Sequence, residues 1–170
     1  MNIYVGTYAK YNNGSIYGEW VDITKYNTIE SFYEKCENIH KDELDPEYMF
    51  QDYEYIPKNL VSESWISKAV FQIIKLVKDK DERIAFLEYI DNKGYNYESD
   101  DIDEAYNNFK ESFVGKYSNM QDYFDEELDE RLDNELEDND LRYYINYKQY
   151  YENNKQDYFY TSNGYLFYNI

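Results

Sequence analysis

The chain has 170 residues, of which 36 are Asp or Glu and 17 are Lys or Arg, so its formal net charge at pH 7 is −19. Nucleic acid and anionic membranes repel such a protein, so the composition excludes direct DNA or RNA binding and favours basic surfaces as partners. The 24 tyrosines predict thin hydrophobic cores with much exposed Tyr. A single cysteine allows no internal disulfide, and no apolar run is long enough to span a bilayer, so we predict a soluble, cytoplasmic protein.

Strands are predicted for much of residues 1–60. The segment 2–8 is β-prone, Asn12-Asn13-Gly14 indicates a turn, and the strand pattern resumes over 15–23. A third strand is predicted over 48–56, immediately before a proline.

One helix is predicted among these strands, over residues 29–39. Thr28 precedes it and can cap its first turn. The apolar residues recur at helical spacing and predict one buried face: Ile29, Phe32, Tyr33, Cys36 and Ile39.

The middle block, residues 61–97, carries no net charge and is predicted to form two helices. Ser62 or Ser64 opens the first, whose inward-facing residues are Ile66, Ala69, Val70, Ile73 and Val77. The second begins after Asp79 with the pattern of a capping box and ends near Gly94.

The last block, residues 98–170, is predicted to open with helices. Asp100 or Asp101 caps a helix that runs to Gly115, and Ser118 caps the next one. Apolar residues follow every four positions along this second helix: Phe124, Leu128, Leu132 and Leu136.

The C-terminal segment is predicted to form a short helix and a β-hairpin. The helix covers 145–153, and the β-prone runs 157–161 and 165–170 flank Ser162-Asn163-Gly164, a strong hairpin signal. The fold class is therefore α+β, an elongated chain of three small domains. They are an N-terminal α/β domain at 1–60, a helical domain at 61–97 and an acidic α+β domain at 98–170.

The sharpest chemical feature is the segment from 122 to 140, which carries eleven carboxylates against Arg131 alone. A helix of this length spans about 28 Å, over which duplex DNA carries roughly 17 charges. Like charges four residues apart destabilise a helix. Their accumulation indicates either a binding surface selected for its charge or a solvated face that keeps the protein soluble. The carboxylates are Asp122, Asp125, Glu126, Glu127, Asp129, Glu130, Asp133, Glu135, Glu137, Asp138 and Asp140.

A second acidic cluster precedes the first helix of the last block: Glu98, Asp100, Asp101, Asp103 and Glu104. It can belong to the same binding surface. Acids at a helix N-terminus are also ordinary partners of the helix dipole, and both interpretations can hold together.

No motif for catalysis, a cofactor or a metal is recognisable. Cys36 and His40 are four residues apart, but two ligands do not complete a zinc site. The segment 133–144 lacks the Gly and Glu that an EF-hand needs. We therefore predict no catalytic residue, no cofactor and no metal site. The alternative from another class is a carbohydrate-acting enzyme that uses a pair of carboxylates.

Several short segments resemble the ArdA antirestriction proteins. They are Ile3-Tyr4-Val5-Gly6, Gly18-Glu19-Trp20-Val21-Asp22, Phe50-Gln51-Asp52-Tyr53-Glu54, Asp122-Tyr123-Phe124, Asp157-Tyr158-Phe159-Tyr160 and Gly164-Tyr165-Leu166-Phe167. The resemblance implies three small domains paired into a bow-shaped homodimer through the third domain. It also implies that carboxylates imitate the phosphates of bent DNA and block the DNA groove of type I restriction–modification enzymes.

The sequence thus predicts a non-enzymatic DNA mimic. Its partner would be the methyltransferase core or specificity subunit of a type I enzyme, and it would bind no nucleic acid and no membrane. A regulator that sequesters another basic DNA-binding protein is a further alternative. An aromatic surplus over residues 105–124 predicts a homodimer interface at Tyr106, Phe109, Phe113 and Tyr117.

Overall fold

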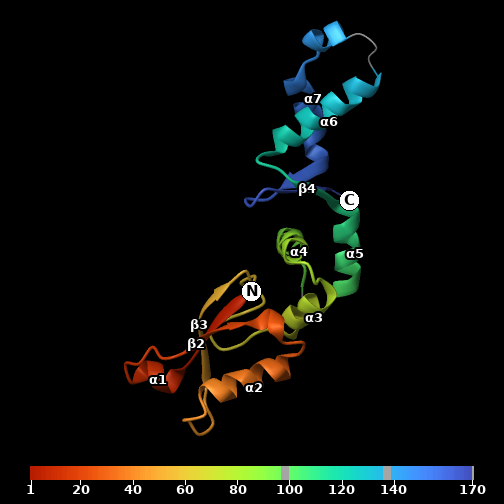
Figure 1. The fold of residues 1–170 in the computed structure, drawn as a ribbon. Coiled ribbons are helices and arrows are strands. Elements are labelled where there is room, and N and C mark those ends of the chain that lie inside the picture. Colours follow the sequence, from red (N-terminus) through yellow and green to blue (C-terminus); the bar gives the residue numbers. More distant parts are fainter. Residues whose placement is uncertain (97–99, 136–138, 170) are drawn as a thin grey trace. The chain divides into compact units, whose positions relative to one another are not determined.

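The computed structural model describes residues 1–96, 100–135 and 139–169. It divides into two compact units, Met1–Tyr106 and Asn107–Ile170, and the boundary falls within a helix (Figure 1). Each unit holds a small three-stranded antiparallel sheet together with helices, which confirms the α+β class. Within the described ranges, every helix is too short or too polar to cross a lipid bilayer. The three-domain division and the elongated arrangement stay predictions.

The sheet of the first unit has the order β2-β1-β3, with β1 (Asn2–Thr7) between β2 (Glu19–Asp22) and β3 (Tyr48–Glu54). The predicted strand over 15–23 is too long at both ends: the carbonyl of Ile16 lies outside the ladder and accepts from the Tyr4 hydroxyl (3.0 Å), and Ile23 begins a 3₁₀ turn. A short helix, α1 (Tyr8–Asn12), precedes the predicted turn, and a 3₁₀ turn, η1 (Ile23–Lys25), follows β2.

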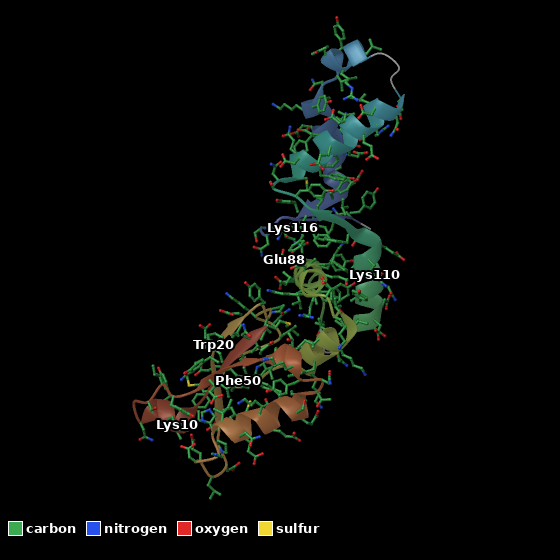
Figure 2. The ribbon with its side chains drawn as sticks, viewed as in Figure 1. Lys10, Trp20, Phe50, Glu88, Lys110 and Lys116 are labelled. Carbon is green, nitrogen blue, oxygen red and sulfur yellow. The ribbon has the colours of Figure 1, made fainter. Side chains whose placement is uncertain are left out.

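Helix α2 (Ile29–Ile39) has the predicted bounds and packs on this sheet. Its cap, Thr28, forms a reciprocal capping box with Ser31, which satisfies amide groups that the first turn leaves without partners. Phe50 of β3 turns toward α2, where its ring lies 5.9 Å from that of the buried Phe32 (Figure 2).

Helix α3 (Lys68–Leu76) starts later than predicted, after Ser67, whose side chain accepts from the Ala69 amide at 3.2 Å. Residues 61–66 instead form a β-bridge, and the carbonyl of Glu63 accepts from the Phe50 amide at 2.7 Å. The predicted inward-facing set is buried as expected. The rings of Phe71 and Phe32 lie 5.8 Å apart, so α3 shares the core of the first sheet.

Helix α4 (Lys80–Lys93) confirms both of its predicted ends. The Asp79 carboxylate accepts from the Glu82 amide at 2.8 Å, and Gly94 ends the helix in the left-handed conformation, with φ 70°.

Helix α5 (Ile102–Ser112) ends before the predicted Gly115, and residues Phe113–Lys116 form strand β4. β4 pairs with β6 (Tyr165–Tyr168), which pairs in turn with β5 (Tyr158–Tyr160). The predicted C-terminal hairpin is therefore confirmed, and it gains a third strand. The helix gives way to β4 because Phe113 packs across the sheet against Phe167 (5.6 Å).

The helices of the second unit are α6 (Met120–Glu135) and α7 (Tyr147–Asn154), with 3₁₀ turns η2 (Asn139–Tyr144) and η3 (Lys155–Asp157) before and after α7. Asn119, rather than the predicted Ser118, caps α6, and its side chain accepts from the Asp122 amide at 3.0 Å.

A substitution at Gly164 can test the close approach between the C-terminal hairpin and Tyr117, which precedes α6. Its φ is +91°, and an added Cβ would lie 2.7 Å from the Tyr117 carbonyl oxygen. We expect Gly164→Ala to cost about 3 kcal/mol and to lower the urea midpoint followed by circular dichroism. Gly14→Ala is the control, because its φ of +79° gives strain without a contact within 4 Å. Equal losses for both variants would contradict the role of the close approach.

Candidate acidic interaction surface

Helix α6 presents one apolar stripe to the core and carboxylates elsewhere. Phe124, Leu128 and Leu132 are between 1% and 8% exposed, as the spacing predicts. The carboxylates at 126, 129, 130, 133 and 135 are exposed, and those at 122, 125 and 127 are partly exposed. Leu136 of the predicted stripe and Glu137 and Asp138 of the predicted carboxylates lie outside the described residues, as does the side chain of Asp140.

Three of these carboxylates, Asp122, Glu126 and Glu130, follow one another every four residues and form what we call the outer row. Residues four apart share one side of a helix and rise about 6 Å along it. Among the side chains that the structure describes, none donates a hydrogen bond to the outer row or pairs with it. The outer row is therefore available to cations from another molecule.

Three other carboxylates of α6, those of Glu127, Asp129 and Asp133, are held by side chains that follow the helix in the chain. The Tyr150 hydroxyl donates to Glu127 at 2.6 Å and accepts from Arg131 at 3.2 Å. The Tyr147 hydroxyl donates to Asp129. Each phenol fixes the position of a carboxylate and leaves its negative charge in place.

The hydroxyls of Tyr147 and Tyr150 hold their protons more tightly than a free tyrosine does. Hydrogen bonding to Asp129, followed by burial, raises the pKa of Tyr147. Burial, followed by the hydrogen bond to Glu127, raises the pKa of Tyr150. Both groups therefore remain neutral donors at physiological pH.

Arg142 is the one residue of η2 that pairs with α6 through a charge in the described part of the chain. Its guanidinium lies 3.6 Å from the Asp129 carboxylate and also pairs with Asp133. These two aspartates are four residues apart, so a single guanidinium spans them. The pairing offsets part of the local charge but does not reach the outer row.

Two carboxylates of the second acidic cluster, at the start of α5, accept hydrogen bonds from nearby backbone amides. The Asp101 carboxylate accepts from the amides of Asp103 (2.8 Å) and Glu104 (3.2 Å), which caps the helix. The Asp100 carboxylate accepts from the Asn96 amide at 2.8 Å. Asp103 and Glu104 are exposed, and Glu98 lies outside the described residues.

The four residues predicted for a dimer interface have different surroundings and remain a prediction. The Tyr106 hydroxyl, in the first unit, donates to Glu82 at 2.7 Å, which together with burial raises its pKa to about 12. Phe109 is 1% exposed and stacks on Phe113 in the second unit. Phe113 is 37% exposed on β4, an edge strand of its sheet, and Tyr117 is partly exposed.

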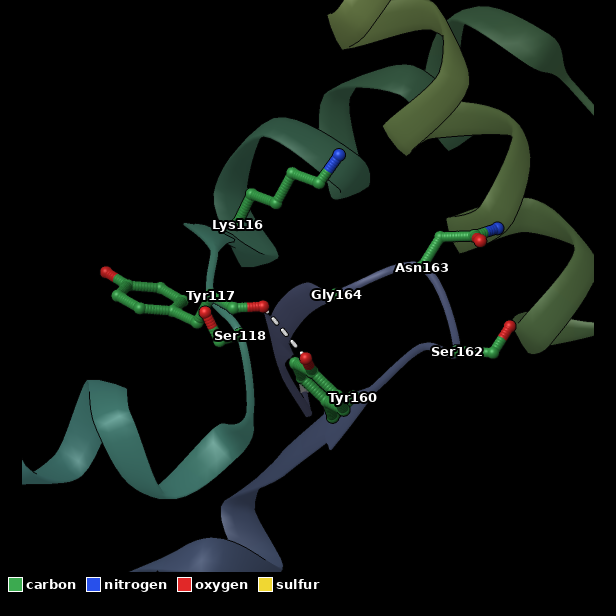
Figure 3. Close-up of a pocket in the computed structure, with 7 residues that line it drawn as sticks. All are labelled: Lys116, Tyr117, Ser118, Tyr160, Ser162, Asn163 and Gly164. Carbon is green, nitrogen blue, oxygen red and sulfur yellow. Dashed lines mark hydrogen bonds between the residues drawn. The ribbon is translucent and has the colours of Figure 1, made fainter.

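An open pocket of about 420 Å³ lies at the turn between β5 and β6 (Figure 3). The Tyr160 hydroxyl donates to the Tyr117 carbonyl at 2.8 Å across it. Hydroxyls, an amide and one ammonium can form hydrogen bonds there. The lining residues are Lys116, Tyr117, Ser118, Tyr160, Ser162, Asn163 and Gly164.

His40 is buried in the first unit beside an ion cluster that reaches the surface. One ring nitrogen of His40 contacts the Val5 carbonyl (3.1 Å), and the other lies 3.1 Å from the ammonium of Lys10. Lys10 belongs to α1 and is labelled in Figure 2. That ammonium also pairs with Asp42 (2.9 Å) and Glu43 (3.2 Å). The three side chains that could surround a metal ion thus already share a cation of the chain itself. Burial raises the pKa of the Cys36 thiol to about 12 and leaves it unreactive.

Sequence reasoning missed the part that η2 and α7 take in this surface. Arg142, Tyr147 and Tyr150 lie between 9 and 23 residues from the carboxylates that they hold. Helical periodicity pairs residues three or four apart and carries no information on such contacts. The one available signal was compositional, since a Tyr-rich segment follows the acidic run directly.

The phenol contacts can be tested without changing the charge. We expect Tyr150→Phe to lower the free energy of unfolding by about 1 kcal/mol, because it removes a hydrogen bond to a charged group and keeps the ring. Tyr143→Phe is the control, since that side chain is 88% exposed. Urea unfolding measures both, and equal stability of the two variants would contradict a structural role for the Tyr150 hydroxyl.

Comparison with known proteins bears on the whole chain rather than on the acidic helix alone. A family model described as antirestriction protein (ArdA) matches residues 3–167. A search of curated proteins finds no match. The resemblance seen in scattered short segments therefore extends over nearly the full sequence.

Proposed function

Since the chain belongs to the ArdA family of antirestriction proteins, we propose that it inhibits type I restriction–modification enzymes by occupying their DNA-binding groove. The observation that carries this proposal is the surface of α6. Carboxylates of the outer row have no cation from the described part of the chain, and the neighbouring Glu127 is held in place by the neutral hydroxyl of Tyr150. A groove lined by Lys and Arg to bind phosphates would meet a comparable array of charge.

A folded mimic has a physical advantage over DNA because it does not have to be bent when it binds. Bending a short DNA site costs of order 1–6 kcal/mol, and that cost falls on the complex with real DNA. Carboxylates on a helix and its packed neighbours are already placed before binding. A mimic can therefore compete with DNA although its linear charge density is lower.

The mechanism is competitive occlusion and requires no chemical step. Lys and Arg side chains of the enzyme exchange their phosphate contacts for contacts with carboxylates. Binding should weaken as salt rises, as DNA binding does, because the contacts are between charges at an accessible surface.

The direct test is a pull-down of a purified type I methyltransferase core by the protein, with and without competing duplex that carries the recognition site. Capture that duplex displaces supports occlusion of the groove. Capture that persists at saturating duplex would place the contact elsewhere on the enzyme, and no capture would overturn the proposal.

The outer row should act as a distributed charge. We expect Glu130→Gln alone to weaken inhibition two- to fivefold, because one exposed charge pair contributes about 0.2–1 kcal/mol. The triple variant Asp122→Asn, Glu126→Gln, Glu130→Gln should weaken it by more than tenfold and reduce the salt dependence. Inhibition of DNA cleavage over a series of salt concentrations measures both.

A matched control removes the same charge from exposed positions in the first unit: Glu34→Gln, Glu37→Gln and Glu47→Gln. It should weaken inhibition less than the outer-row triple variant. Complete loss of inhibition by a folded Glu130→Gln protein would contradict the distributed model, and equal losses in the two triple variants would contradict the special role of α6.

We also propose that the protein is a homodimer joined through the second unit. Phe113 supports this, because a large aromatic side chain that is 37% exposed on an edge strand is suited to an interface. Phe109 does not offer such a surface, since it is 1% exposed. A dimer would double the length of charge presented to the enzyme.

Light scattering across a dilution series tests the dimer. We expect wild type to have twice the monomer mass at tens of micromolar, and Phe113→Asp to be a folded monomer by circular dichroism. Tyr168→Asp, at a residue that is 41% exposed in the same unit, is the control and should stay dimeric. If Phe113→Asp unfolds, Tyr117→Ser provides the second variant. A monomeric wild type would overturn the interface.

A further inference from the structure

The turn η2 and the residue that follows it, Ile145, expose large apolar side chains that the acidic surface does not explain. Leu141 is 49% exposed, Tyr143 88%, Tyr144 85% and Ile145 37%. Single exposed apolar residues are ordinary, but four within five consecutive positions form a patch of the kind that marks an interaction site. We call these four residues the aromatic tip.

Arg142 fixes the aromatic tip at a defined place. Its guanidinium contacts α6 at the carboxylates of Asp129 and Asp133, and also donates to the Asp129 carbonyl at 3.4 Å. The residue in the middle of the segment is thus anchored, and the residues on both sides of it face solvent. Within the second unit, η2 lies at the end of the α6–α7 pair that is remote from the sheet (Figure 1).

The charge around the aromatic tip favours some binding partners over others. Nucleic acid is repelled by the carboxylates of α6. A second copy in a symmetric contact would bring its own acidic α6 toward the first, which like charges disfavour. A basic protein surface is attracted instead. Arg142 also offsets two carboxylates beside the tip, so less charge must be stripped of water when the tip is covered.

We propose that the aromatic tip inserts into an apolar hollow at the border of the basic groove that the outer row engages. This inference rests on the proposed function and adds a contact that charge alone does not supply. Tyr is among the residues that dominate binding energy at protein interfaces, because a rigid ring buries a large area at low entropic cost. The outer row would then attract the enzyme, and the aromatic tip would slow its release.

The two contributions differ in their response to salt, which makes them separable. Contacts between charges weaken as salt rises, whereas burial of apolar surface does not. We expect Tyr143→Ser/Tyr144→Ser to lower affinity for a type I methyltransferase core by at least about tenfold at every salt concentration, with the salt dependence unchanged. The outer-row triple variant should flatten the salt dependence.

The control variant, Tyr11→Ser/Ile16→Ser, removes exposed apolar side chains from the first unit, where they are 53% and 76% exposed. It should bind within twofold of wild type. A tip variant within twofold of wild type at all salt concentrations would overturn the inference. So would a tip variant that loses affinity only because light scattering shows a change in oligomeric state, since the occupant would then be a second copy. Failure of wild type itself to bind the core would instead overturn the proposed function.

Discussion

A phenol that donates to a carboxylate holds it in position without cancelling its charge, and the acidic surface depends on this interaction. A lysine or arginine would fix the same side chain more strongly but would offset the charge that the surface presents. Glu127 is held in this way by Tyr150, whereas Asp129 accepts from Tyr147 and is also paired with Arg142. The hydrogen bond of Tyr106 to Glu82 repeats the arrangement in the first unit. A protein that must be both acidic and rigid has reason to be rich in tyrosine.

The same rings also build the core of the second unit. Phe124 of α6 is surrounded by the rings of Tyr150, Tyr151 and Tyr158, with centroids 5.1–6.2 Å away and planes tilted by 69–83°. A tyrosine can bury its ring against such a neighbour and still extend its hydroxyl to a carboxylate at the surface. One side-chain type thus connects a thin core to a charged exterior, which Leu or Phe could not do.

Sequence patterns correctly predicted those features of the fold that depend on interactions between residues close together in the chain. The cap at Thr28, the ends of α4 and the apolar stripe of α6 follow from contacts within one or two turns. Strand β4 was predicted as helix because Phe109 and Phe113 are spaced four apart, yet Phe113 also packs on Phe167, 54 positions later. The roles of Arg142, Tyr147 and Tyr150 were missed for the same reason. Family resemblance over the whole chain gave the functional class that spacing alone left open.

Arg142 has a consequence beyond its anchoring of η2. Its guanidinium bridges two carboxylates, Asp129 and Asp133, one helical turn apart on α6. The same one-turn interval recurs twice along the outer row, from Asp122 to Glu126 and from Glu126 to Glu130. An incoming arginine with the same reach could bridge either of these pairs in the same manner. Asp122, Glu126 and Glu130 thus offer an incoming arginine two steps with the same spacing along the helix as the step that Arg142 spans.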